Sequence, residues 1–176
     1  IGRIPLFDTL CISFGTAGTG GFGIVNDSMG SYSTYCQVVT TIFMILFGVN
    51  FSAYYLLLTK KFVQAFKFEE VPYMAYGIPF VTYYFGIILA AILVIGLNTA
   101  HLFRNLGEAF QQAAFQVGSI ITTTGFSSTD FSQWPSLSKT ILVLLMFVGA
   151  CAGSTGGGIK VSRILILCKA AKKEFQ

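Results

Sequence analysis

Charged side chains are scarce in this sequence of 176 residues. Only 10% of the residues are Asp, Glu, Lys or Arg, whereas 54% are hydrophobic and the mean hydropathy is +0.72. Soluble globular domains carry about 25% charged residues, so this class is excluded by composition. Each of three apolar, charge-free stretches accommodates the roughly 20 residues of a spanning helix. These observations predict an all-α integral membrane protein. The stretches are Asp27 to Lys60, Glu70 to Arg104 and Lys139 to Lys160.

Clusters of reactive or metal-binding side chains are also lacking. His101 is the single histidine and has no cysteine or carboxylate at ligand spacing, which argues against a catalytic or metal site. The four cysteines lack any C-x-x-C pair and serve as small apolar filler. The net charge of +4 comes from residues that flank apolar spans, so it reports membrane topology rather than nucleic-acid binding. The cysteines are Cys11, Cys36, Cys151 and Cys168.

Three apolar stretches predict the spanning helices. Residues 35–59 form the first, and the lysine-rich residues 60–70 that follow are expected on the cytoplasmic side. Residues 73–98 return outwards, and Pro79 is expected to kink this helix. The last helix begins near Pro135 and runs inwards to the basic end of the sequence.

The segment between the second and third of these helices is unusually polar. Between Ala109 and Thr129 there is no charge, yet ten of the 21 residues are Gln, Ser or Thr. Both of its ends must lie outside, so we expect a re-entrant excursion in which a short helix, from about Gly107 to Ile121, enters the bilayer and the chain returns extended. Non-helical backbone at that depth is tolerated only where protein or a water-filled cavity surrounds it. The segment therefore predicts a pore.

The sequence contains a weak internal repeat. A shift of 104 residues lays "TGGFG" at 19–23 on "TTGFS" at 123–127, and Asp27 then nearly coincides with Asp130. Each unit reads as a polar re-entrant helix, a glycine turn, an acidic outer loop and a spanning helix. Internal repeats are common in transport proteins, where the binding site lies at the repeat interface.

Two glycine-rich stretches imitate nucleotide-binding motifs without satisfying them. "GTGGFG" at 18–23 has the G-x-G-x-x-G spacing, but no acidic residue follows between Asp27 and Glu69, where a dinucleotide fold requires one. "GSTGGGIK" at 153–160 resembles a phosphate loop, but Ile159 precedes the lysine where glycine is required. Neither stretch predicts phosphate binding.

The repeated Thr-x-Gly-Phe pattern instead suits the dehydration of a cation. Glycine permits the backbone dihedrals that turn successive carbonyls to one side, where their oxygens replace the hydration shell. Asp27 and Asp130, just outside, would raise the local cation concentration. The alternative is that Gly21 and Gly125 only allow close helix packing, which leaves the adjacent threonines unexplained.

The motifs of this sequence resemble those of the Trk/Ktr/HKT superfamily of potassium transporters, and most closely those of the bacterial Trk-type membrane subunit. The resemblance rests on "TTTGFSSTDF" (122–131), "GTGGFG" (18–23) and "GSTGGGIKVSRILIL" (153–167). It implies repeats of helix, pore loop and helix related to potassium channels. The chain would be the C-terminal half, repeats three and four. Residues 1–70 would hold the pore loop and second helix of one repeat, and residues 71–176 a complete repeat.

The resemblance also implies the site. Potassium would be bound by the backbone carbonyls of two filter segments, in which Gly21 and Gly125 match the selectivity glycines. The family's intramembrane gate loop would correspond to "GVNFSA" at 48–53, where Gly48 and Asn50 interrupt an apolar run. The filter residues would be Thr19, Gly20, Gly21 and Phe22 in one segment and Thr123, Thr124, Gly125 and Phe126 in the other.

A basic residue on the last helix completes the implied gate. Arg163 is the first candidate and Lys160 the second, after three glycines at 156–158 that weaken a helix by roughly 1 kcal/mol each and predict a bend. A purely structural role stays open for both features. "GVNFSA" could be a packing site, and the Lys160 and Arg163 side chains could lie at the cytoplasmic interface and extend to lipid phosphates.

The resemblance further implies a multi-pass protein of the plasma (inner) membrane that takes up potassium and is not an enzyme. Its partners would be membrane lipids, the N-terminal half of the same protein, a second copy in a homodimer, and a cytoplasmic nucleotide-binding regulatory subunit near Lys60 and Lys172. No covalent cofactor is expected. Two other transport functions stay open, a subunit of a tetrameric potassium channel and a sodium-permeable cation transporter. A membrane enzyme would need an acid/base cluster that the spans lack.

Overall fold

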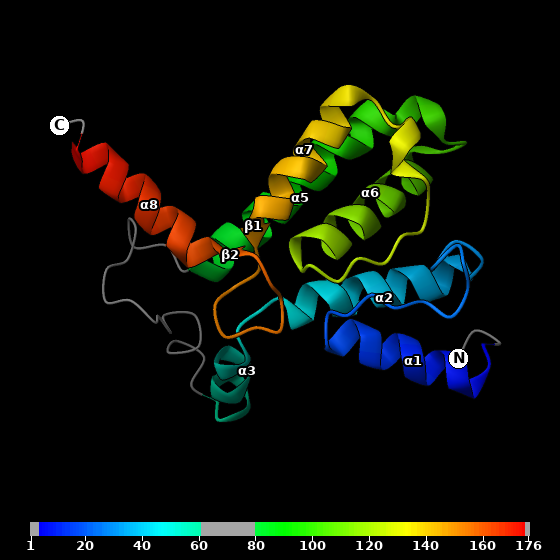
Figure 1. The fold of residues 1–176 in the computed structure, drawn as a ribbon, viewed down its shortest axis with the longest axis horizontal. Coiled ribbons are helices and arrows are strands. Elements are labelled where there is room, and N and C mark those ends of the chain that lie inside the picture. The colour runs from blue at the N-terminus through cyan, green and yellow to red at the C-terminus, as the bar shows by residue number, and fades with distance from the viewer. Residues whose placement is uncertain (1–3, 61–79, 175–176) are drawn as a thin grey trace.

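The computed structural model describes residues 4–60 and 80–174. Two groups of helices form the main body of the fold, and α3 (Phe51–Leu58) and α8 (Val161–Glu174) extend from it (Figure 1). One group contains α5 (Phe80–Thr99), α6 (Leu106–Ile121) and α7 (Ser136–Phe147), which pack side by side. The other contains α1 (Leu6–Ala17) and α2 (Thr34–Phe47), and α2 packs on α6 to join the groups. The short helix α6 begins within one residue of the position that the sequence predicts and ends at the predicted residue.

Among the described residues, one helix is long and apolar enough to cross a membrane. It covers Thr82–Leu102, with 21 residues and a hydropathy of 2.1, and includes α5 and the 3₁₀ turn η1 (Ala100–Leu102). The shorter apolar helices α1, α2 and α7 have 10–17 residues. The predicted kink at Pro79, the predicted domain boundary at residues 70 and 71 and most of the lysine-rich loop lie outside the described residues.

Two of the predicted spans are interrupted. Helix α2 ends at Phe47 and α3 (Phe51–Leu58) begins after three non-helical residues, as the sequence predicts for Gly48 and Asn50. In Figure 1, α3 points away from the axis of α2. The last span breaks after α7 and resumes as α8 (Val161–Glu174). The break expected at the three glycines is present, but it extends from residue 148 to residue 160.

The second interruption contains the only two β-strands of the described residues. Strand β1 (Val148–Gly149) pairs in parallel with β2 (Ile159–Lys160), in the register Val148 to Ile159 and Gly149 to Lys160. Buried backbone groups that leave a helix need other partners. The ladder supplies them where the loop begins and ends, so the prediction of an all-α fold is corrected to a mostly helical fold with one two-residue ladder.

The apolar core forms two clusters. The larger lies between α5, α6 and α7 and includes the buried Tyr84, Ile95 and Leu142. The smaller lies between α1, α2 and α6, and Phe126 from the chain after α6 closes it. The chain five residues beyond the end of α6 is therefore anchored by the core of the neighbouring helices.

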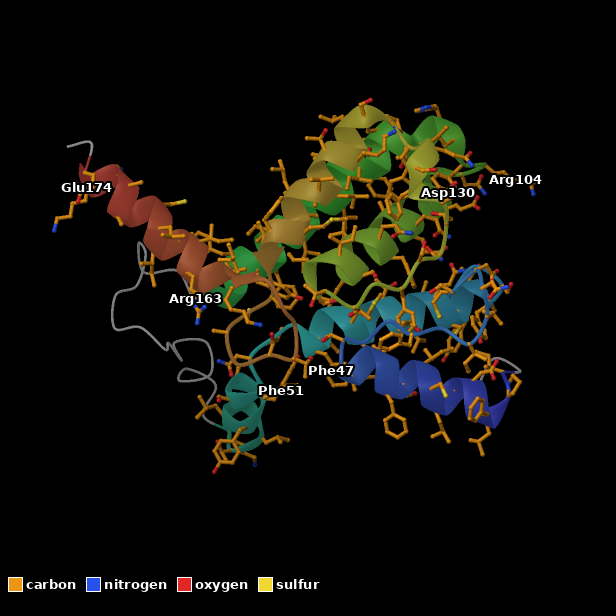
Figure 2. The ribbon with its side chains drawn as sticks, in the orientation of Figure 1. Phe47, Phe51, Arg104, Asp130, Arg163 and Glu174 are labelled. Carbon is orange, nitrogen blue, oxygen red and sulfur yellow. The ribbon has the colours of Figure 1, made fainter. Side chains whose placement is uncertain are left out.

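The charged ends of the molecule are well separated. Arg104 and Asp130 lie at one end of the helices, and Arg163 and Glu174 lie on α8 at the other end (Figure 2). The sequence predicts Asp130 outside and Arg163 towards the cytoplasm. Their places at opposite ends agree with that topology.

Candidate cation pathway

Two extended segments follow the short helices α1 and α6. Segment A comprises residues 18–23 and segment B comprises residues 122–127. Both leave their helix through the same backbone hydrogen bond. Gly20 donates its N–H to the Gly15 carbonyl (2.8 Å), and Thr124, 104 positions later, donates to the Ser119 carbonyl (2.9 Å). The local conformation thus recurs at the spacing of the sequence repeat.

The two segments also share an alternating set of backbone dihedrals. Thr19 and Gly21 have φ of 50° and 64°, and Thr123 and Gly125 have φ of 57° and 86°. The residue between each pair keeps a φ outside the left-handed region. In a strand, successive carbonyls point to opposite sides, whereas alternation between left- and right-handed dihedrals turns them to one side. A non-glycine residue at positive φ is uncommon, so the two threonines mark a strained backbone typical of functional sites.

Segments A and B are in direct contact. A Cβ added to Gly21 would lie 1.9 Å from the Thr124 carbonyl oxygen, so only glycine fits between them. The Phe126 ring from segment B packs on α1, where it would lie 3.1 Å from a Cβ at Gly15. The two halves of the candidate site are therefore joined through backbone and ring contacts.

One side of segment B is open. Thr123 and Gly125 are exposed, whereas Thr122, Thr124 and Phe126 between and beside them are buried. A Cβ added to Gly125 would meet nothing within 4 Å. Segment B thus presents alternate residues to an unfilled space and anchors the others in the protein.

The predicted acidic residues lie in the loops that follow the two segments, and both are exposed. The Asp27 carboxylate accepts a hydrogen bond from the Ser31 hydroxyl. The Asp130 carboxylate accepts from the Ser132 backbone N–H (3.0 Å) and from the Gln133 amide (3.3 Å). Hydrogen bonds from Ser132 and then Gln133 lower the pKa of Asp130. Asp130 therefore carries its negative charge over the whole physiological pH range.

The loop between the two strands, loop 150–158, contacts both segments. The Thr19 hydroxyl donates to the Thr155 carbonyl (3.0 Å), and the Gly157 N–H donates to the Thr123 hydroxyl (2.7 Å). Equivalent threonines of segments A and B thus bind the same loop. A Cβ added to Gly156 would lie 3.1 Å from the Thr122 carbonyl oxygen, so the glycines of this loop permit its close approach.

The break between α2 and α3 also joins loop 150–158. Cys151 donates its N–H to the Gly48 carbonyl (3.0 Å), and Phe51 donates to the Gly153 carbonyl (3.1 Å). A Cβ added to Gly153 would lie 2.9 Å from the Asn50 side chain. The predicted gate residues Gly48 and Asn50 therefore lie beside the loop. Figure 2 labels Phe47 and Phe51 at the two sides of this break.

The non-helical break after α2 is shorter than the stretch 48–53 that the sequence suggests as the gate loop. Residues 48–50 leave the helix, but Phe51 to Ala53 are helical, because α3 begins at Phe51. The longer excursion, and the one that contacts both segments, is loop 150–158.

The two candidate basic residues have different surroundings. Lys160 is half-buried, and its ammonium group donates a hydrogen bond to the Gly156 carbonyl of loop 150–158. Arg163 lies in the first turn of α8 and is exposed. The sequence ranks Arg163 first, but it is Lys160 that holds the loop in this structure.

Sequence reasoning missed two kinds of residue at this site. The sequence assigns Thr155 and Gly157 no role of their own in the glycine-rich stretch 153–160, although the density of glycines there is a signal of close backbone contact. Gln37 was counted as part of an apolar span, although it is the only amide in the first 14 residues of that span. In the structure, Gln37 is buried and hydrogen-bonded to α6.

Comparisons with known proteins agree on one family. The family model "TrkH: Cation transport protein" matches residues 1–176. The Trk system potassium uptake protein TrkH of Vibrio parahaemolyticus is 33% identical over 171 residues, which cover 97% of this chain and 34% of that protein. The protein of the same name from Escherichia coli is 32% identical over 171 residues, with the same shares.

A solved structure has the same fold. The crystal structure of the potassium transporter TrkH from Vibrio parahaemolyticus matches with a TM-score of 0.85 and 31% identity, over 98% of this chain and 36% of that one. The chain spans about a third of the length of the curated relatives that it matches. From the match over its full length, this chain belongs to the TrkH family of cation transport proteins.

Proposed function

We propose that the chain forms part of the ion pathway of a membrane potassium transporter. The relatives are named as potassium uptake proteins, and their names support potassium as the transported ion. In this proposal, segments A and B are two adjoining walls of a selectivity filter. The backbone carbonyls of residues 19–22 and 123–125 replace the water around a dehydrated potassium ion. The carbonyl of Phe126, the last of the predicted filter residues, accepts a hydrogen bond from the buried Ser119 hydroxyl.

One observation carries this proposal. Positive φ recurs at Thr19 and Gly21 and again at Thr123 and Gly125, in two segments that contact each other. Close packing of helices needs small residues but no such alternation. A cation site made of carbonyl oxygens needs both the alternation and the open side that Gly125 borders.

Loop 150–158 is the proposed gate, together with Gly48, Asn50, Lys160 and Arg163. The loop is bonded to Thr19 and Thr123, at the end of each segment nearest its helix. An ion that leaves the filter on that side has to displace the loop. The Lys160 ammonium group, which binds the loop, adds positive charge where a cation would pass. The conformation described here is therefore interpreted as closed.

The remaining assignments follow the family. Residues 1–70 are proposed as the pore loop and second helix of one repeat, and residues 71–176 as a complete helix–pore loop–helix repeat in the cell membrane. Asp27 and Asp130 form the outer vestibule. Because the relatives are named as parts of a "Trk system", a regulatory partner at the basic cytoplasmic surface near Lys172 and a homodimer are proposed as well.

A tetrameric channel with four identical pore loops is the second candidate. Gly20 differs from Thr124 and Gly23 differs from Ser127, so segments A and B are not identical. A pore of four identical loops would therefore use one of the two segments from each of four chains and leave the other segment outside the pore. Contact between segments A and B within one chain favours the repeat arrangement over that candidate.

Substitution of Gly125 by serine in the full-length transporter tests the proposed filter. The new side chain would enter the open space beside segment B, so the packing is preserved and the added cost is the positive φ, about 1–2 kcal/mol. We expect potassium uptake to lose its preference over sodium in cells that lack other potassium uptake systems. Gly86→Ser on α5 is the matched control, because a Cβ there also meets nothing within 4 Å. Unchanged selectivity of the Gly125 variant, at normal expression, would contradict the filter.

A further inference from the structure

A row of polar side chains lies behind segment B, away from its open side. Gln112, Gln116 and Ser119 occupy one face of α6 and are all buried. Positions four and three residues apart on a helix point the same way. Buried amides and hydroxyls are costly unless they are hydrogen-bonded, so this row must have partners.

Two members of the row hold the outer end of segment B directly. The Ser119 hydroxyl donates to the Phe126 carbonyl (2.5 Å). The Gln116 amide donates to the Ser127 hydroxyl (3.3 Å) and to the Thr129 carbonyl (3.1 Å). The chain just beyond the proposed filter is therefore fastened to its own short helix by side chains.

The third member connects segment B to the other repeat. The Ser128 hydroxyl donates to the Gln112 amide oxygen, and the Gln112 amide nitrogen donates to the Gln37 amide oxygen (3.2 Å). Gln37 comes from α2, and its nitrogen donates to the Met29 carbonyl (3.0 Å) and the Tyr32 carbonyl (3.3 Å). We call Ser128, Gln112 and Gln37 the glutamine relay.

Backbone contacts close the relay into a ring. Met29 donates its N–H to the Ser127 carbonyl (2.8 Å), and Ser127 donates its N–H to the Ser28 hydroxyl (3.2 Å). The outer loop after segment A and the chain after segment B are thereby tied together twice, once directly and once through two buried glutamines. Closed networks of this kind hold one arrangement, because each bond orients the next.

The direction of the relay is fixed. Gln37 accepts at its oxygen from Gln111 (3.0 Å) and from Gln112, and it donates at its nitrogen to two carbonyls. A flipped Gln37 amide would set NH₂ against NH₂ and oxygen against carbonyl oxygen. The side chain therefore has one satisfied orientation, as a buried amide with four partners requires.

We propose that Gln37 and Gln112 are positioning residues for ion selectivity. This inference rests on the proposed filter. The two glutamines hold Ser128 at a fixed distance from the outer loop of the neighbouring repeat, while Ser119 and Gln116 fasten residues 126, 127 and 129 to α6. The carbonyls of segment B thereby stay at the spacing of a potassium ion. Without the relay, segment B closes more readily around the smaller sodium ion, and discrimination falls.

The test compares ion selectivity in the full-length transporter. Methionine is unbranched and close in size to glutamine, so Gln37→Met and Gln112→Met remove the hydrogen bonds and keep most of the volume. Gln112→Met removes two hydrogen bonds and Gln37→Met removes four. Each variant is expected to lower the potassium-over-sodium uptake preference at least about fivefold. The double variant should lower the preference about as much as one single variant does, and not by the product of the two fold-changes, because both substitutions break the same Gln37–Gln112 contact.

A matched control uses a polar contact between helices that lies outside the relay. Asn98 donates to the Ser138 hydroxyl (2.8 Å) and joins α5 to α7. Asn98→Leu is expected to lower the amount of folded protein without changing the preference. A general loss of packing would affect this variant and the glutamine variants alike, whereas a positioning role changes the selectivity of the glutamine variants alone.

The outcomes separate the inference from the proposed function. Unchanged selectivity in both glutamine variants, with a changed ratio in Gly125→Ser, overturns the relay and leaves the filter in place. No change in any of the three overturns the filter itself. Where the glutamine variants do not accumulate, Ser128→Ala removes only the hydroxyl at the end of the relay. A lowered potassium-over-sodium preference of Ser128→Ala would support the relay, and an unchanged preference would overturn it.

Discussion

Segment A and segment B share a backbone conformation but lie in different surroundings. Positive φ falls at the same two positions in both. The Phe126 ring of segment B is 1% exposed and packs on α1, whereas the equivalent Phe22 of segment A is 83% exposed. The shared backbone conformation thus depends on the threonine and glycine positions. The burial of the phenylalanine ring depends on whether a short helix lies beside it, as α1 does beside Phe126.

The helices before the two segments also hold their outer loops differently. Where α6 has an amide that binds Ser128, α1 has Asp8, whose carboxylate accepts from the Tyr32 hydroxyl (3.0 Å). Burial, and then the bond to Asp8, raise the pKa of Tyr32 to about 12, so Tyr32 stays neutral and keeps its proton to donate. One backbone geometry is therefore retained with two different sets of supporting side chains. The equivalent α1 and α6 residues are Asp8 and Gln112, Ile12 and Gln116, and Gly15 and Ser119.

The largest effect is expected from the aromatic residues of the two segments. Phe126→Ala removes a buried ring from the smaller apolar cluster, at a cost of about 3–5 kcal/mol in the free energy of unfolding. If the proposed repeats surround one pore, a further short helix of the full-length transporter covers Phe22, as α1 covers Phe126 here. Phe22→Ala is therefore expected to cost a similar amount in the free energy of unfolding. Melting temperatures in detergent measure both. A cost for Phe22→Ala below about 0.5 kcal/mol would contradict that requirement.

A moderate effect is expected from the threonines that bind loop 150–158. Thr19→Val and Thr123→Val keep the shape of the side chain and remove its hydroxyl. Each variant loses one hydrogen bond to loop 150–158, which contributes about 1 kcal/mol to the stability of the closed arrangement. We expect each variant to raise the resting potassium flux about fivefold, because the closed arrangement loses that stabilisation.

Thr140→Val on α7 serves as the control, because its exposed hydroxyl binds only its own helix. Single-channel or liposome flux measurements compare the three variants. A flux that falls in Thr19→Val and Thr123→Val would mean that the loop does not close the pathway.

The smallest effect is expected from the acidic residues of the two loops. Asp130→Asn and Asp27→Asn each remove one exposed charge, which should weaken apparent potassium affinity by less than about threefold and only at low ionic strength. Because its hydrogen bonds lower the pKa of Asp130, the charge persists as the pH falls and is lost only below the usual Asp range, near 4. Uptake at pH 5 and pH 7 should therefore show the same Asp130→Asn effect. An effect that disappears at pH 5 would contradict the lowered pKa.

Local sequence patterns predicted much of this structure. The polar run before segment B identified α6 to within one residue at its start, and Gly48 and Asn50 identified the break after α2. Both features arise from the chemistry of nearby residues, since an amide-rich helix and a pair of helix-breaking residues are visible in a short window. The family resemblance rests on equally short motifs.

Contacts between distant residues could not be predicted in the same way. The extent of loop 150–158 depends on bonds to Thr19 and Thr123, and its apolar flanks are compatible with a helix. The glutamine relay joins Gln37 to Gln112, which are 75 positions apart. Only the packing of α2 on α6 brings these amides together, and no pattern within either helix records that packing.

The most direct test of the central claim is to locate the ion. Crystals of the full-length transporter grown with rubidium in place of potassium would reveal the ion by its anomalous scattering. We expect a peak on the open side of segment B, coordinated by backbone carbonyls from residues 19–22 and 123–125. Well-ordered segments without a peak between them, and rubidium bound elsewhere, would contradict the assignment of these two segments as a potassium filter.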